Sequence, residues 1–258
     1  MSDAHDGERA AGHLSRDATP LDLRGLGRGA NADVGVVIVA GGSGSRVGSR
    51  ELKQFRWVAG KPMLLHSIHA FQARDDVSMV VVVLPRAFAG DPPPWIFQSD
   101  LERLLLSVGG AERMDSVRNG LEDLPPECDY VVVHDAARPL VSVPLIDRVL
   151  VEARRGHGAV AALPVVDTIK EVDDDGRIIR TVDRTRLWRA QTPQAFPRDL
   201  LERAHVEARE RQIIATDDAA LFEALGYPVQ VVRGSERAMK ITDEADFERA
   251  NALEPVPE

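Results

Sequence analysis

Short, continuous runs of apolar and β-branched residues alternate with helix-like segments along most of this chain. Such runs are typical of strands that are buried on both faces of a sheet. We expect strands at residues 34–40, 79–84, 105–108, 130–134, 159–165 and 229–233. We expect helices at residues 62–73, 97–104, 115–124, 144–155, 198–209, 217–225 and 243–252. This alternation predicts an α/β fold with a Rossmann-like, mostly parallel sheet and helices on both faces.

The alternation breaks at residues 166–187. Two strand-like segments there flank Asp175 and Gly176, a pair that is typical of a hairpin turn. A lone hairpin of this length is too small to bury a core of its own. We therefore expect an inserted β-hairpin arm that packs on another surface, for which a second subunit, as in a homodimer, is a natural candidate.

Composition limits the class of protein. The 258-residue chain has a formal net charge of −9, which argues against broad nucleic-acid binding but not against a small anionic substrate. We find no apolar run of membrane-spanning length and no secretory signal, and the single cysteine, Cys128, permits no internal disulfide. These features predict a cytoplasmic protein. Residues 1–33 lack apolar periodicity, so we expect a disordered tail there.

The first expected strand runs directly into the glycine loop "AGGSGSRVG" at residues 40–48. In α/β sheets, ligands bind at the carboxyl ends of the strands, and glycines there let backbone N–H groups approach a phosphate. The dinucleotide fingerprint fails because Val47 occupies the position of its third glycine, and the chain has no P-loop motif. A plain turn remains an alternative. Arg46 and Lys53 favour a triphosphate along the loop, which both cations would neutralise.

Six further motifs follow in order: "GGAERMDSV" at 109–117, "VVVHDAARP" at 131–139, "PVVDTIK" at 164–170, "TVDRTRLWRAQTPQAF" at 181–196, "TDDAALFEALG" at 216–226 and "MKIT" at 239–242. Together with the glycine loop, they resemble the 2-C-methyl-D-erythritol 4-phosphate cytidylyltransferase family of the non-mevalonate isoprenoid pathway, over about residues 34–250. The resemblance implies that residues 34–258 form one nucleotidyltransferase domain. It also implies transfer of CMP from CTP to methylerythritol phosphate, with release of pyrophosphate.

The resemblance assigns roles to individual residues. It implies that catalysis depends on Arg46, Lys53 and Lys240. It places around the nucleotide Ala40, Gly41, Gly42, Gly44, Gly110 and Ser116. It places around the second substrate Asp135 and Arg138, together with Thr168 and Arg184 from the partner's arm. It implies Mg²⁺ as a cofactor, bound mainly through the CTP phosphates, and it assigns no protein ligand to the metal.

Each assignment has a simpler alternative. Asp135 could cap a turn, and Arg184 could be an ordinary hairpin charge. We expect His134 to be packed or hydrogen-bonded, and at least one of Asp217 and Asp218 to be a helix N-terminal charge.

The chain also departs from the family pattern at three positions. Gly41 stands where alanine is common, Leu52 stands where proline is usual, and Ala111 stands where some members carry an acidic residue near the base.

Three other functions stay open. A ribitol 5-phosphate cytidylyltransferase would share every triphosphate motif and differ only in its pocket for the alcohol. A non-catalytic nucleotide-binding module is disfavoured because Arg46, Lys53 and Lys240 are all present. An NAD-dependent dehydrogenase is disfavoured by the missing third glycine.

Overall fold

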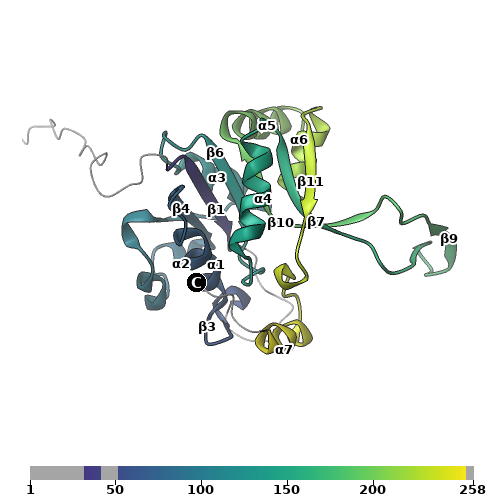
Figure 1. The fold of residues 1–258 in the computed structure, drawn as a ribbon, viewed down its shortest axis with the longest axis horizontal. Helices are drawn as coiled ribbons and strands as arrows, with labels where there is room; N and C mark the ends of the chain where they lie inside the picture. Colours follow the sequence, from purple (N-terminus) through teal and green to yellow (C-terminus); the bar gives the residue numbers. More distant parts are fainter. Residues whose placement is uncertain (1–31, 42–51, 254–258) are drawn as a thin grey trace, which may run out of the picture.

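The computed structural model describes residues 32–41 and 52–253, and these residues are built around a seven-stranded sheet with the order β11-β7-β10-β6-β1-β4-β5 (Figure 1). Its strands are β1 (Val34–Val39), β4 (Val77–Leu84), β5 (Leu104–Val108), β6 (Tyr130–Asp135), β7 (Gly158–Pro164), β10 (Trp188–Pro197) and β11 (Val229–Arg233). Strand β10 is antiparallel to both of its neighbours, and every other adjacent pair is parallel. The predicted mostly parallel α/β fold is therefore confirmed.

Helices cover both faces of the sheet. One core lies beneath α1 (Met63–Gln72), α2 (Arg86–Ala89) and α4 (Val143–Ala153). The other core lies beneath α3 (Arg113–Glu122), α5 (Arg198–Glu210) and α6 (Asp218–Ala224). The last helix, α7 (Glu244–Ala252), lies apart from these layers and contacts β2 of the small hairpin β2–β3 (Trp57–Val58 and Lys61–Pro62) (Figure 1). No helix in the described ranges has both the length and the apolar character needed to cross a membrane.

Strand β1 shows why the segments predicted as strands are mostly apolar on both faces. Val36 and Ile38 belong to one core and Val37 to the other, because successive side chains of a strand point to opposite faces. On the α3 side, Gly120 permits a close approach: a Cβ atom there would lie 2.6 Å from Cγ1 of Val37. This contact brings α3 down onto β1, so that the first turn of α3 lies close to the carboxyl end of that strand.

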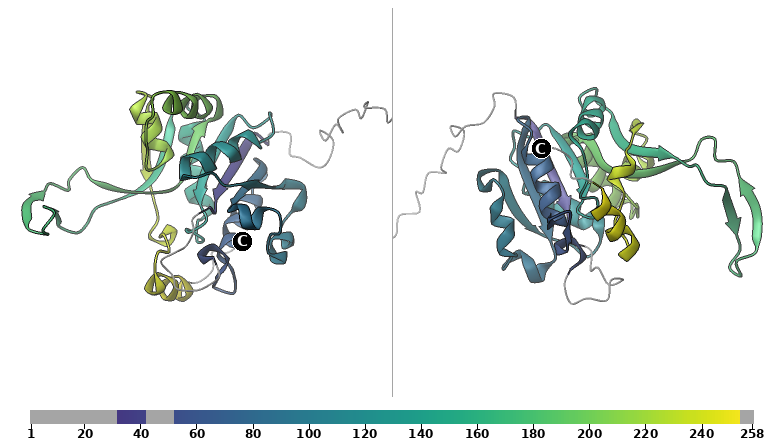
Figure 2. Two further views of the ribbon diagram at one scale, coloured as in Figure 1. Left: turned by 180° about the vertical axis from the view of Figure 1, so that it is seen from behind. Right: turned by 60° about the horizontal axis from the view of Figure 1, so that its bottom comes forward.

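The β-hairpin predicted within residues 166–187 is confirmed, whereas its packing on a second subunit stays a prediction. Strands β8 (Ile169–Val172) and β9 (Ile178–Val182) pair antiparallel, and Gly176 adopts a φ of 79° in the turn between them. Figures 1 and 2 show the arm extending away from the sheet and helices in every view. Three apolar side chains of the arm, Val172, Ile178 and Ile179, are at least half exposed. In a single chain the arm therefore leaves apolar surface in contact with water.

The helix predicted at residues 97–104 is wrong. Two short 3-10 helices, Pro94–Gln98 and Leu101–Arg103, lie there instead, and strand β5 already begins at Leu104. The side chain of Asp100 accepts a hydrogen bond from the backbone N–H of Glu102, which starts a new turn in the middle of the expected helix. Residues 1–31 of the expected tail lie outside the described residues.

Strand β10 was not predicted, although it lies inside the sheet between β6 and β7. Its sequence contains Pro193, and proline is unusual within a central strand because it cannot donate to the ladder. The structure accommodates this proline where the pairing with β7 shifts register, between Ala190 and Gln194. A strand that needs such an irregularity gives no regular pattern in the sequence.

Candidate functional site

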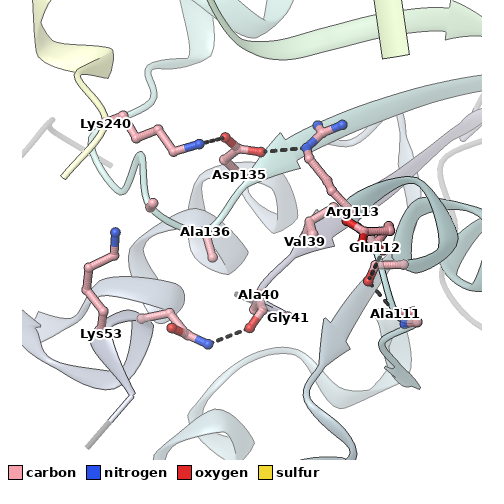
Figure 3. Close-up of a pocket in the computed structure, with 14 residues that line it drawn as sticks. Val39, Ala40, Gly41, Lys53, Ala111, Glu112, Arg113, Asp135, Ala136 and Lys240 are labelled. Atoms are coloured by element: carbon pink, nitrogen blue, oxygen red, sulfur yellow. Dashed lines mark hydrogen bonds and ion pairs between the residues drawn. The ribbon is translucent and has the colours of Figure 1, made fainter. Parts of the chain in front are cut away.

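A pocket of about 390 Å³ lies at the carboxyl ends of β1 and β6 (Figure 3). The chain leaves β1 toward β4 and β5 on one side and later returns to place β6 on the other side. This reversal makes a crevice at the strand ends, which is where open α/β sheets bind their ligands. Seven of the residues singled out from the sequence line the pocket: Ala40, Gly41, Lys53, Gly110, Ser116, Asp135 and Lys240.

The end of β1 forms the floor of the pocket. The backbone N–H of Ala40 continues the ladder to Val83, and its carbonyl accepts a hydrogen bond of 2.5 Å from Nε2 of Gln54. Gln54 belongs to the 3-10 helix η1 (Lys53–Phe55), so this bond fixes the segment that carries Lys53 beside the strand. The sequence analysis did not single out Gln54, although it directly follows Lys53.

The first turn of α3 forms a second wall, close to the glycines. Oγ of Ser116 accepts a hydrogen bond from the N–H of Gly110 and donates one to the carbonyl of Glu112, each 3.1 Å long. Gly110 leaves no room for a side chain, because a Cβ atom there would lie 2.2 Å from the Cβ of Asp115. This arrangement fixes the direction of the Gly110 peptide group at the wall of the pocket.

A row of alternating charges crosses the pocket. Nζ of Lys240 lies 2.8 Å from Oδ2 of Asp135, and Nε of Arg113 lies 3.3 Å from Oδ1 (Figure 3). Burial raises the pKa of Asp135, but the positive charges of Arg113, Lys240 and Arg138 lower it by more, so that this pKa lies well below its usual range. Asp135 is therefore ionised at neutral pH, and its carboxylate contacts cations rather than capping a turn.

The two lysines reach the pocket from distant parts of the chain. Lys53 belongs to η1, whereas Lys240 follows the 3-10 helix η4 (Glu236–Ala238). Nζ of Lys53 donates a hydrogen bond of 2.6 Å to the carbonyl of Ile241, which directly follows Lys240. Two ammonium groups held in one pocket can neutralise a polyanion such as a triphosphate.

Arg138 lies outside this pocket and lines a neighbouring one of about 490 Å³, which Lys240 also lines. The guanidinium of Arg138 is buried and donates hydrogen bonds to the carbonyls of Ala238 and Ala190. Three further arginines line this second pocket: Arg189, Arg237 and Arg249. With Glu236 and Asp246 as its acidic residues, the second pocket has a net positive charge.

Two of the remaining predicted residues lie on the arm, away from the pockets of their own chain. Thr168 and Arg184 are exposed on the arm, where Arg184 donates a hydrogen bond to the carbonyl of Val166. They line neither of the two pockets described above. Gly42, Gly44 and Arg46 fall outside the described residues.

The sequence analysis did not predict the ion pair between Arg113 and Asp218. Arg113 lines the pocket, and its Nη1 lies 2.7 Å from Oδ2 of the fully buried Asp218. Asp217, by contrast, is the N-cap of α6, which agrees with the expectation for one of these two residues. Arg113 stands within the quoted motif "GGAERMDSV", but its partner lies 105 residues away.

His134 is packed and hydrogen-bonded, as expected. Its Nε2 lies 3.1 Å from the carbonyl of Arg138, and its Nδ1 lies 3.1 Å from the hydroxyl of Thr192. A carbonyl only accepts, so Nε2 carries the proton and Nδ1 accepts from the hydroxyl. Burial, with the charges of Arg138 and Arg113, lowers the pKa of His134 to about 4. The imidazole is therefore neutral and serves to hold the end of β6.

Within the described part of the chain, no group of three or more His, Cys, Asp or Glu side chains could hold a metal ion. Asp135 and Glu112 are the carboxylates that line the pocket. The side chain of Glu112 caps the N-terminus of α3, which leaves Asp135 as the carboxylate that faces cations. A single carboxylate suits Mg²⁺ that is bound mainly through substrate phosphates.

Comparison with known proteins identifies a family. The family model for 2-C-methyl-D-erythritol 4-phosphate cytidylyltransferase (IspD) matches residues 34–254. The enzyme of that name from Desulforamulus reducens is 42% identical over 219 residues, which cover 84% of this chain and 94% of the relative. The one from Pelotomaculum thermopropionicum is 42% identical over 226 residues, which cover 85% and 93%.

A solved structure agrees with this match. The crystal structure of 2-C-methyl-D-erythritol 4-phosphate cytidylyltransferase from Thermus thermophilus superposes with a TM-score of 0.73 at 38% identity, and the match covers 86% of this chain and 98% of that one.

The environment of His134 predicts a loss of stability in acid. The unfolded chain takes up a proton on this residue below about pH 6.5, whereas the folded chain does so only near pH 4. The contribution of His134 to the free energy of unfolding is therefore complete above pH 6.5, and about 3 kcal/mol of it is lost as the pH falls to 4. Urea unfolding between pH 7.5 and 4 should show that the free energy of unfolding of His134→Gln depends less steeply on pH than that of the wild-type protein. The matched control is His157→Gln, at a half-exposed position. Equal slopes in wild type and His134→Gln would contradict the prediction.

Proposed function

Because the chain belongs to the 2-C-methyl-D-erythritol 4-phosphate cytidylyltransferase family, we propose that it transfers CMP from CTP to 2-C-methyl-D-erythritol 4-phosphate and releases pyrophosphate. One observation carries this proposal: a single pocket brings Ala40 and Gly41 at the end of β1 together with two lysines from distant segments, Lys53 and Lys240. Two ammonium groups beside the end of a buried strand suit a nucleoside triphosphate.

In the proposed reaction, a phosphate oxygen of methylerythritol phosphate attacks the α-phosphorus of CTP. The new O–P bond forms as the bond from the α-phosphorus to the bridging oxygen breaks, and pyrophosphate leaves with that electron pair. Such a transfer needs positioning and charge stabilisation rather than a protein nucleophile. Lys53 and Lys240 supply positive charge at the pocket, and Arg46 in the glycine loop would add to it.

We propose that the nucleotide lies along Ala40 and Gly41 and reaches Gly110 and Ser116, with Gly42 and Gly44 in the loop that follows β1. Oγ of Ser116 holds the N–H of Gly110, so the peptide groups at this wall have fixed directions. Ala111 offers no side-chain group to a base, so recognition of cytosine at this position falls to the backbone.

We propose that the second substrate lies on the side of Asp135 and Arg138. The second pocket supports this placement, because it shares Lys240 with the first and carries an excess of arginines suited to a phosphate. We further propose that the protein is a homodimer whose arms cross, so that Thr168 and Arg184 of one subunit reach the substrate of the other. The exposed apolar side chains of the arm support this arrangement.

We propose Mg²⁺ as the cofactor, held mainly by the phosphates of CTP and by Asp135, the pocket carboxylate that faces cations. When bound, the metal supplies positive charge that offsets the charge of the triphosphate. We also propose that residues 34–258 act as one nucleotidyltransferase domain, a range that the match at residues 34–254 supports. A cytoplasmic location agrees with the single cysteine.

The first test is pyrophosphate release by the purified protein with Mg²⁺ and CTP. We expect release with methylerythritol 4-phosphate and none with ribitol 5-phosphate. Release with ribitol 5-phosphate alone would keep the cytidylyl transfer and move the protein to the sister reaction. If neither alcohol phosphate gives pyrophosphate release although CTP binds measurably, the proposed reaction is contradicted and a non-catalytic nucleotide-binding module is favoured.

Removing either pocket lysine should act on the transition state. We expect Lys53→Ala and Lys240→Ala each to lower kcat about 100-fold, with a much smaller rise in KM for CTP, because charge develops during the transfer. Steady-state kinetics checks this split. The control is Lys61→Ala in β3, which does not line the pocket and should keep kcat within about twofold. An unchanged kcat in both pocket variants would show that Lys53 and Lys240 do not take part in catalysis.

Mixed dimers test the crossing arms. Arg184→Ala and Lys53→Ala subunits should each be nearly inactive as homodimers. In a heterodimer of the two, one site receives an intact arm and an intact pocket, so we expect about half of the wild-type activity per dimer. Tagged subunits that are co-expressed and purified as heterodimers allow this measurement. If each site takes all its residues from one chain, the heterodimer will stay as inactive as its parents.

A further inference from the structure

The row of alternating charges formed by Lys240, Asp135 and Arg113 continues from the pocket into the core. Arg113 contacts Asp135 on its pocket side at 3.3 Å and the fully buried Asp218 on its core side at 2.7 Å. Nε2 of His205, which is 4% exposed, lies 3.5 Å from the other oxygen of Asp218. Asp218 and His205 do not line the pocket. The buried part of the row therefore reaches the pocket through Arg113.

Asp218 is held in place by the start of α6. Gln194 of β10 donates a hydrogen bond of 2.8 Å from Nε2 to Oδ2 of Asp217, and its Oε1 accepts one of 3.1 Å from the N–H of Ala219. Asp217 also caps the helix through the N–H of Ala220. These bonds fix the backbone on both sides of Asp218. Its carboxylate consequently has a set position behind the pocket.

A carboxylate at this depth needs a physical reason. Burial raises the pKa of Asp218, but the positive charge of Arg113 and its hydrogen bond of 2.7 Å lower it by more, so the group stays ionised. Replacing a buried ion pair by apolar residues is often neutral or stabilising, so a buried pair by itself is weak evidence for a stabilising role. The distances indicate another role, because Arg113 lies closer to Asp218 than to the pocket carboxylate.

We propose that Asp218 is a positioning residue that holds Arg113 back from Asp135 and so keeps the Asp135 carboxylate available to the substrate. Without the negative charge of Asp218, Arg113 would close on Asp135 and compete with the ligands of the pocket. His205 supports this role by facing the second oxygen of Asp218. The inference rests on the proposed function, in which Asp135 contacts the second substrate.

The primary test is Asp218→Asn, which removes the charge and keeps the volume. We expect kcat/KM for methylerythritol 4-phosphate to fall about tenfold, while KM for CTP changes less than about twofold. The matched control is Asp147→Asn, which also removes the carboxylate of an arginine ion pair, with Arg74, but lines neither pocket. An equal loss in both variants, or no loss in Asp218→Asn, would overturn the proposal.

A mutant cycle shows whether Asp218 acts through Arg113. In an Arg113→Gln background, adding Asp218→Asn should change kcat/KM less than about twofold, because the side chain that Asp218 positions is already gone. The double variant removes both charges of the buried pair, so it leaves neither of them uncompensated. A full tenfold loss in the double variant relative to Arg113→Gln would show a purely structural role.

A spectroscopic measurement tests the positioning without turnover. The Nε–Hε resonance of Arg113, identified by its loss in Arg113→Gln, should shift in Asp218→Asn and stay in place in Asp147→Asn. An unchanged resonance in Asp218→Asn would contradict the proposal. If the wild-type protein releases no pyrophosphate with either alcohol phosphate, the proposed function fails. The resonance then still decides whether Asp218 sets the position of Arg113.

Discussion

The Asp135 carboxylate, ionised at the end of β6, is the group on which the rest of the site depends. A buried charge is tolerated only where opposite charges and hydrogen bonds surround it. Asp135 meets this condition through Arg113 of α3 and Lys240 of the segment after η4. Both segments must therefore meet at the strand end, and their meeting encloses the pocket.

The sheet fixes the positions of the segments that surround the end of β1. Strand β1 packs helices on both faces, and Gly120 lets α3 approach Val37 closely enough to hold the start of α3 beside the end of β1. The hydrogen bond from Gln54 to Ala40 fixes the Lys53 segment to the same strand end. Rigid elements thus carry the side chains on three sides of the pocket, as catalysis by positioning requires.

Two pockets share Lys240, and the proposed function assigns one anionic substrate to each of them. The arm projects from the strands beside them and exposes apolar side chains in the single chain (Figure 2). In the proposed dimer, one feature would bury that surface and complete the partner's substrate pocket. Assembly and activity would then be coupled, since a site without its partner would lack two of its substrate contacts.

The family resemblance implied half of the residues that line the pocket. Local patterns in the chain were enough to predict the α/β class, the hairpin arm and every strand of the seven-stranded sheet except β10. These features follow from local rules: β-branched runs, a glycine turn after a buried strand, and an Asp-Gly pair between two strand-like segments. The place of β10, the two 3-10 helices near Ile96 and Leu101, and the pairing of Arg113 with Asp218 became visible only in the folded chain. For β10 and the ion pair, the cause is separation along the chain. A strand with a proline at a register shift, and an ion pair across 105 residues, depend on how remote segments pack, and no local pattern records that packing.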